Sequence, residues 1–178
     1  MKLFLALDLP KKVKTLLEEQ IIPFKKEYPQ FEWVSVKNYH ITIHFFGEIE
    51  DVEKLQKGLE ECLFDQESFY LYSFGADLFI NHKIAPYLSF RREKKLESIA
   101  KRVKESFQNQ NVPSQRYIPH LTLARARVPS KQQYFVLKKR MSKLEIDISF
   151  NVKELVLFKS ILGGKFPVYK IVKKIPLL

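Results

Sequence analysis

The stretch that most constrains the fold runs from Tyr39 to Gly47 and reads Tyr-His-Ile-Thr-Ile-His-Phe-Phe-Gly. Polar and apolar residues alternate here with a period of two, which is typical of a β-strand with one buried face. His40, Thr42 and His44 are therefore expected on one face, and the isoleucines on the other. An imidazole and a hydroxyl two residues apart then stand side by side on a rigid strand.

Nearly the same pattern returns as Pro-His-Leu-Thr-Leu-Ala-Arg over residues 119–125. His120 and Thr122 share one face of this second strand, and the two leucines point to the other. A single His-x-Thr pattern is weak evidence, because it more often marks an exposed strand face than a site. Two of them, each with an apolar residue on both sides of the threonine, favour a catalytic pair over coincidence.

The motifs lie in similar surroundings along the chain. A helical pattern beginning near Lys11 precedes His40 by 29 residues (40 − 11), and one beginning near Glu93 precedes His120 by 27 (120 − 93). The same order of elements thus occurs twice: a helix, then a strand or loop, then the motif strand, then a helix. No linker rich in Gly, Ser or Pro separates the two units. The repeat therefore predicts two lobes that pack together and are related by a pseudo-twofold axis.

The periodicity of the whole chain predicts an α+β fold in one domain over residues 1–178, with motifs at 40–43 and 120–123. We expect two pseudo-symmetric, intertwined lobes of antiparallel sheet, helices on the outer faces, and both His-x-Thr strands facing a central cleft. Strands are predicted at residues 2–9, 31–36, 39–47, 68–76, 87–91, 119–125, 147–158 and 168–175. Helices are predicted at 11–27, with Asp8 as its cap, and at 51–64, 93–110 and 131–143. Connections are predicted at 77–86, 109–114 and Gly163-Gly164.

Composition narrows the class of protein. The hydrophobic content of 46%, with 15 Phe and 8 Tyr, excludes a disordered chain. A net charge of +11 points to nucleic acid first and to an acidic membrane surface second, although a lysine-rich protein without such a partner stays open. The single Cys62, expected in the core, excludes an intramolecular disulfide and a cysteine-rich zinc site. With neither a signal peptide nor a membrane-spanning segment in the sequence, we expect a cytoplasmic monomer.

Two histidines can divide acid–base work at neutral pH, because the unperturbed imidazole pKa is near 6.5. A neutral base on one side of a phosphorus atom and a protonated acid on the other suit in-line displacement. Thr42 and Thr122 would each donate a hydroxyl to a phosphoryl oxygen. Arg125 points away from that face by simple alternation, but a strand end or bulge would bring its guanidinium to the anion.

The sequence gives weaker evidence for a catalytic role of the other histidines and for a metal site or a phosphate-binding loop. His44 has no counterpart after the second motif, where Ala124 stands, so it is interpreted as a residue of the cleft wall or a substrate contact. His82 is interpreted as a surface residue. His40 and His44 are too far apart along an extended strand for easy metal chelation, and no Asp or Glu shares the motif faces. No metal or cofactor is therefore predicted, and no glycine-rich phosphate loop is present.

Several segments together resemble the RNA 2′,3′-cyclic phosphodiesterases of the two-histidine (2H) phosphoesterase superfamily, once studied as 2′-5′ RNA ligases. The resemblance covers essentially the entire chain. The segments that carry it are Leu-Phe-Leu-Ala-Leu-Asp-Leu-Pro at 3–10, Trp33-Val34, Asn-Tyr-His-Ile-Thr-Ile at 38–43, Phe-Phe-Gly-Glu at 45–48, the motif at 119–125, Tyr169, and Pro176-Leu177.

The resemblance implies hydrolysis of the 2′,3′-cyclic phosphate end of RNA, or of a small cyclic nucleotide, to a 2′-phosphate without a metal. By motif order, His40 would be the general acid and His120 the general base, while Thr42, Thr122 and Arg125 would hold the phosphate. Two departures concern substrate contact: His44, where relatives commonly carry lysine, and residues 87–90, where a tryptophan is frequent. A non-catalytic module for RNA ends, and a 2′-5′ ligase working by the reverse chemistry, remain alternatives.

Overall fold

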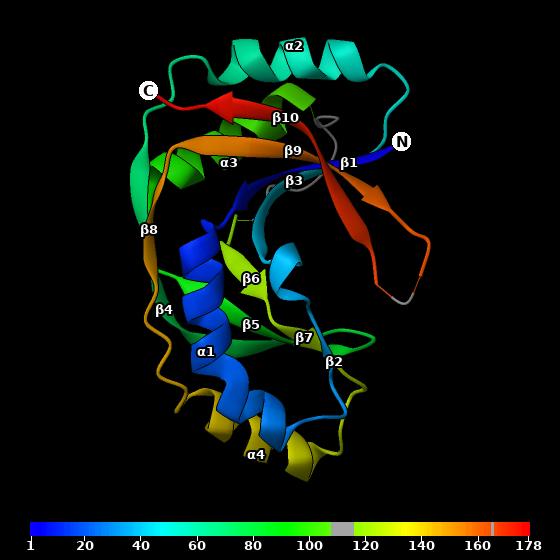
Figure 1. The fold of residues 1–178 in the computed structure, drawn as a ribbon, viewed down its shortest axis with the longest axis vertical. Helices are drawn as coiled ribbons and strands as arrows, with labels where there is room; N and C mark the ends of the chain where they lie inside the picture. The colour runs from blue at the N-terminus through cyan, green and yellow to red at the C-terminus, as the bar shows by residue number, and fades with distance from the viewer. Residues whose placement is uncertain (108–115, 165) are drawn as a thin grey trace.

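Each His-x-Thr motif lies on a different four-stranded antiparallel sheet (Figure 1). The structure, a computed structural model, describes residues 1–107, 116–164 and 166–178. The strands of the first sheet are β1 (Lys2–Asp8), β3 (His40–Glu48), β9 (Glu154–Ile161) and β10 (Val168–Pro176). Those of the second are β4 (Phe69–Ile80), β5 (Ile84–Phe90), β6 (His120–Thr122) and β8 (Ser149–Val152). Their orders are β10-β9-β1-β3 and β6-β5-β4-β8, so the first motif occupies an edge strand of one sheet and the second motif an edge strand of the other.

Helices cover these sheets, and a short ladder links the two halves of the chain. The helices are α1 (Lys11–Glu27), α2 (Val52–Leu63), α3 (Lys94–Phe107) and α4 (Lys131–Met141), with a 3-10 turn η1 (Val36–Asn38). In Figure 1, α2 lies beyond β9 and β10 at one end of the molecule, and α4 lies at the other end. The ladder pairs β2 (Glu32–Trp33) with β7 (Ala124–Arg125). The predicted α+β class with antiparallel sheets is confirmed.

The first strand shows how one core supports both sheets. Leu3, Leu5 and Leu7 of β1 are buried in the main hydrophobic core, which also takes in the leucines of β6, β9 and the helices. Phe4 and Ala6 point to the opposite face, where they are buried in a smaller aromatic cluster. Because both faces of β1 are covered, its side chains are apolar almost without interruption, and its neighbours β3 and β9 are held rigidly in place.

The predicted strand at residues 147–158 is wrong, since the structure divides it into two strands on different sheets. β8 pairs with β4 of the second sheet, and β9 pairs with β1 of the first. The break falls at Lys153, an exposed residue between buried Val152 and a continuous buried run beginning at Leu155. The chain passes from the second sheet to the first here, so one alternating stretch of sequence forms strands in both sheets.

Two further predictions are corrected. The strand predicted at 31–36 is only the two-residue β2. The Val34 N–H donates to the Leu123 carbonyl in the same antiparallel register, and the chain then enters η1 at Val36. The connection predicted at 77–86 is mostly strand: β4 runs to Ile80 and β5 begins at Ile84, leaving a tight turn at 81–83. Apolar pairs across this hairpin outweigh the turn-forming residues that suggested a loop.

The ends of some elements also differ from the predictions. α1 has Pro10 at its N-cap and no side-chain cap; Asp8, the predicted cap, forms an ion pair with Lys14 at 2.6 Å instead. Cys62, predicted in the core, is half-buried, and its sulfur lies 3.5 Å from the Ser106 hydroxyl. The predicted end of the third helix at 108–110 and the link at 109–114 lie outside the described residues.

Two further predictions concern the chain as a whole: the lack of a membrane-spanning segment and the division into domains. None of the helices within the described ranges combines the length and the apolar character needed to cross a bilayer. The division of residues 1–178 into a single domain with an internal repeat stays a prediction.

Candidate active site

Both His-x-Thr motifs line a single cavity of about 690 Å³. β3 contributes His40 and Thr42, and β6 contributes His120 and Thr122. Alternation on each strand buries Ile41 and its counterpart Leu121 while these polar side chains face the cavity. The structure therefore brings together the two motifs, which lie 80 residues apart (120 − 40) in the sequence.

The two imidazoles are anchored in the same way. The Nδ1–H of His40 donates to the backbone carbonyl of Asn38 at 2.6 Å, and that of His120 donates to the carbonyl of Ile118 at 2.9 Å. Each partner lies two residues before its histidine. Because a carbonyl only accepts, both rings carry the proton on Nδ1, and each Nε2 is the nitrogen left for acid–base chemistry.

The position of His40 is fixed from behind by a buried network. Tyr39, the preceding residue, is fully buried, and its hydroxyl donates to the Glu18 carboxylate of α1 at 2.6 Å. The Lys25 ammonium donates to the same carboxylate at 2.6 Å. Burial and the neighbouring carboxylate raise the pKa of Tyr39, so the hydroxyl stays protonated and keeps donating. The start of β3 is thereby fastened to α1.

His40 sits among aromatic rings. The ring centroid of Phe4 lies 5.2 Å from that of His40, and Tyr169 meets it edge-on at 5.1 Å. Burial lowers the pKa of His40, and the hydrogen bond to Asn38 and the charge of Asp8 oppose that change. The positive charge of His120 lowers the same pKa further, which means that the two imidazoles interact across the cavity.

His120 has a different setting. Its ring meets Phe79 of β4 edge-on at 4.8 Å and Tyr87 of β5 at 5.8 Å. These two aromatic rings stack on each other with centroids 3.9 Å apart and planes 14° apart. Tyr87 pairs with Thr122 across the ladder, and Ser89 pairs with His120. A rigid aromatic pair on the second sheet thus supports the second imidazole.

Arg125 lines the cavity although simple alternation directs it away from the His120 face. The reason is a register shift in the pairing with β5: Thr122 pairs with Tyr87 and Ala126 pairs with Ile84, so one extra residue lies between these two pairs, as in a β-bulge. The extra residue reverses the alternation after Thr122 and brings Arg125 to the cavity, while β7 also pairs with β2. The charge of Arg125 acts on the hydroxyl of Tyr169, which lines the same cavity, and opposes the burial that raises the pKa of that tyrosine.

A hydrogen bond joins the two motif segments directly. The hydroxyl of Tyr117, three residues before His120, donates to the backbone carbonyl of Thr42 at 2.9 Å. Burial raises the pKa of Tyr117, so its hydroxyl remains a donor. This contact fixes the chain that leads into β6 against the strand that carries the first motif.

The remaining histidines lie as the sequence suggested. His44 lines the cavity together with Lys104 and Arg116, and burial followed by the charge of Lys104 lowers its pKa. His82 is exposed in the turn between β4 and β5. No group of three or more His, Cys, Asp or Glu side chains that could hold a metal ion occurs in the described part of the chain.

Sequence reasoning did not identify Tyr117, Tyr169 and Phe79 as residues of the cavity. Each lies on a segment far from the first motif, and an aromatic residue in an alternating strand looks like any other core residue. Tyr169 is one of the residues that carry the family resemblance, which gives it no place in the fold. The available signal was the pairing of each motif strand with aromatic-rich neighbours, which only the sheet order makes visible.

Comparison with known proteins agrees with this geometry. The family model described as the 2′-5′ RNA ligase superfamily matches residues 17–163. The RNA 2′,3′-cyclic phosphodiesterase of Methanocaldococcus jannaschii is 30% identical over 98% of this chain and 99% of its own length. That of Thermotoga maritima is 23% identical over 96% of this chain and 92% of its own.

A solved structure gives the same result for the fold. The crystal structure of E. coli LigT complexed with 3′-AMP matches 99% of this chain and 97% of its own with a TM-score of 0.76, at 22% identity. The family match spans most of the chain, and the similarity to the M. jannaschii protein extends over nearly all of it. This chain therefore belongs to the 2′-5′ RNA ligase superfamily.

Proposed function

We propose that this protein is an RNA 2′,3′-cyclic phosphodiesterase, which hydrolyses the cyclic phosphate at the end of an RNA, or a small cyclic nucleotide, to a 2′-phosphate. The observation that carries the proposal is the pair of imidazoles in one cavity, each held through Nδ1 so that Nε2 is available. The relatives from M. jannaschii and T. maritima carry this activity in their names, and E. coli LigT binds 3′-AMP.

In the reaction, water attacks phosphorus and the bond from phosphorus to the 3′ oxygen breaks. One imidazole takes a proton from the attacking water, and the other gives a proton to the departing 3′ oxygen, which leaves as a hydroxyl. The product keeps its phosphate on the 2′ oxygen. Thr42 and Thr122 donate hydroxyl hydrogens to the non-bridging oxygens, and the Arg125 guanidinium stabilises the negative charge that develops on them.

The family resemblance, through the order of its motifs, suggests His40 as the acid and His120 as the base. Burial lowers the pKa of His40, which in the free protein favours the neutral imidazole and thus a base. A bound phosphate would reverse this preference, because an anion beside the ring stabilises the imidazolium. The assignment of His40 as the acid therefore requires that it takes up its proton when substrate binds.

The reaction as proposed uses no metal and no cofactor. A module that only binds RNA ends needs donors and positive charge but not two imidazoles, so the pair favours turnover. Ligation that forms a 2′-5′ bond is the reverse of the same chemistry and would use the same residues.

The test is turnover of a cyclic mononucleotide by His40→Ala and His120→Ala. Loss of a general acid or base should lower kcat by about 10²- to 10⁴-fold. A substrate with sulfur in place of the 3′ oxygen has a leaving group that needs no protonation, so it should restore activity to the variant that lacks the acid. By the motif order that variant is His40→Ala; rescue of His120→Ala instead would reverse the two roles.

His82→Ala is the matched control, since it removes an imidazole that is exposed and outside the cavity. It should turn over at the rate of the unmodified protein. Near-normal turnover by either cavity variant, with circular dichroism and unfolding curves unchanged, would refute the paired acid–base mechanism.

A further inference from the structure

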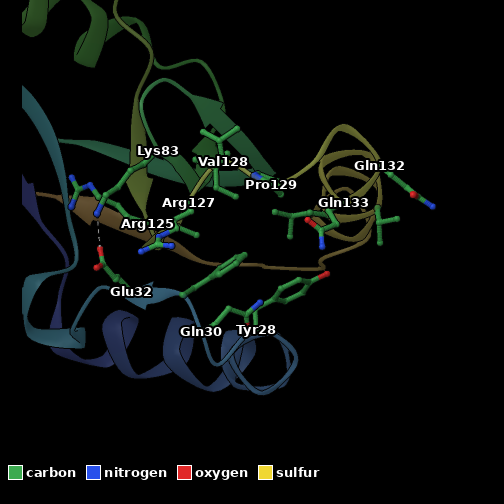
Figure 2. A pocket seen from close by; sticks show the side chains of 15 residues that line it. Tyr28, Gln30, Glu32, Lys83, Arg125, Arg127, Val128, Pro129, Gln132 and Gln133 are labelled. Carbon is green, nitrogen blue, oxygen red and sulfur yellow. Dashed lines mark hydrogen bonds and ion pairs between the residues drawn. The ribbon is translucent and has the colours of Figure 1, made fainter.

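A second cavity, of about 950 Å³, adjoins the active-site cavity, and Arg125 lines both. We call it the side groove. Figure 2 shows Arg125 and Lys83 near one end and the glutamines of α4 at the other. The segments that form it are residues 28–32 after α1, the start of β5, residues 125–129 through and beyond β7, and α4. The active-site cavity and the side groove therefore share the Arg125 side chain.

The charge of the side groove suits a polyanion. Arg125, Arg127 and Lys83 line it, against the single carboxylate of Glu32. Glu32 is held by Lys83 in an exposed ion pair at 3.1 Å. Among the residues that the structure describes, neither Arg125 nor Arg127 forms a hydrogen bond or an ion pair, and both are exposed. Two guanidinium groups are thus available for phosphate oxygens, one where the two cavities meet and one further along the groove.

The walls of the side groove suit bases. The rings of Tyr28 and Phe31 lie with centroids 5.0 Å apart on one side, and both are half-buried, so each keeps part of its surface exposed. Aromatic surfaces stack with any base and so tolerate different sequences. Gln30 and Gln132 are exposed and add amide donors and acceptors that can meet base edges. Exposed Val128 provides apolar surface for a base or a ribose.

From these features we infer that the side groove binds the nucleotides that precede the cyclic end of a single-stranded RNA. The inference rests on the proposed function, because the terminal phosphate must occupy the His40–His120 cavity. The chain then runs in one direction only, since a 2′,3′-cyclic end has no nucleotide after it. The terminal nucleotide fills the active-site cavity, and its cyclic phosphate lies near Arg125. The next phosphate meets Arg127, and the bases lie against the aromatic wall.

The experiment compares binding of a mononucleotide and a tetranucleotide, both ending in a 3′-phosphate so that neither is hydrolysed. The unmodified protein should bind the tetranucleotide more tightly. Arg127→Gln should weaken tetranucleotide binding by about two- to fivefold, as expected for an exposed ion pair. It should also reduce the slope of log K against log salt by about 0.7, the value for one phosphate contact on a single strand. Mononucleotide binding and turnover of a cyclic mononucleotide should not change.

A second variant tests the side groove with a substitution that is not expected to destabilise the fold. Gln132→Glu places a negative charge in the side groove within the first turn of α4, a position where acidic residues stabilise a helix. It should weaken tetranucleotide binding without lowering the unfolding midpoint. Arg91→Gln is the matched control: Arg91 is an exposed arginine that lines neither cavity, and its loss should leave the salt slope unchanged.

The outcomes separate this inference from the proposed function. Equal binding of both ligands by the unmodified protein, or an equal effect of Arg127→Gln on both, would overturn the inference. A tetranucleotide that binds through the side groove as described, in a protein that hydrolyses no cyclic phosphate, would refute the proposed activity and leave the inference standing.

Discussion

Replacing Tyr117 by Phe tests whether the hydrogen bond between the motif segments aligns the two histidines. The substitution keeps the buried ring and removes only the hydroxyl that donates to the Thr42 carbonyl at 2.9 Å. One hydrogen bond of this kind contributes about 0.5–1.5 kcal/mol to the free energy of unfolding. For a chain of this length, a loss of about 1 kcal/mol lowers Tm by about 2–4 °C.

The same energy limits the effect on catalysis. If the hydrogen bond only favours the aligned arrangement over a misaligned one, its loss reduces the aligned population, and hence kcat, by at most about two- to twelvefold. The assay is turnover of a cyclic mononucleotide beside thermal unfolding. Ser73→Ala is the control, because the Ser73 hydroxyl makes buried hydrogen bonds at 2.9 Å with the backbone of Ile146 and Ile148, just before β8, and does not line the cavity. It should lose stability but retain kcat.

Two results would refute this reasoning. If Tyr117→Phe loses stability and keeps full kcat, the contact is structural and does not align the motifs. If kcat falls by more than about 10²-fold, the loss exceeds what one hydrogen bond can provide, and Tyr117 would have to take part in the chemistry itself.

The remaining predictions concern pH and metal ions. The pKa values of His40 and His44 are lowered in the folded protein, so the unfolded chain binds more protons; their contribution to stability is present above the unfolded pKa near 6.5 and is lost as pH falls through the folded values. As pH is lowered below 6.5, Tm should begin to fall at a pH where the carboxylates are still ionised. The double variant His40→Gln, His44→Gln should show a flatter dependence of Tm on pH. A profile of Tm against pH that is the same in this variant would contradict the prediction. Turnover should survive dialysis against a chelator, and a loss that zinc or manganese restores would show that a metal site was missed.

The sequence predicts which residues line the cavity better than it predicts which strands pair. His40, Thr42, His120 and Thr122 could be predicted to face one cavity because alternation is a local property, and two matching local patterns are hard to produce by chance. Which strands pair is not local. The stretch at 147–158 alternates well enough for one strand, yet it serves two sheets, because an exposed lysine midway permits the crossing.

Arg125 illustrates the same limit within the site. Its position three residues after Thr122 directs it away from the cavity on a regular strand, and the extra residue between the Thr122 and Ala126 pairs with β5 brings it back. Nothing in the local pattern predicts this register shift, since Leu123 is as apolar and as buried as Leu121. The aromatic supports of each imidazole were hidden for the same reason, because they come from strands whose pairing the sequence does not reveal.

The repeated motif and its surroundings contribute differently to the proposed chemistry. Both histidines bond through Nδ1 to a carbonyl two residues earlier, so the strand geometry alone delivers two equivalent Nε2 atoms. The surrounding residues then give the two imidazoles different environments. Phe4 and Tyr169 enclose His40 and burial lowers its pKa, while Phe79 and Tyr87 support His120 within the second sheet. In-line displacement needs one acid and one base, so two identical sites would be a poor catalyst. The division of roles therefore depends on the residues that the two lobes do not share, and this is why the motifs by themselves could not assign it.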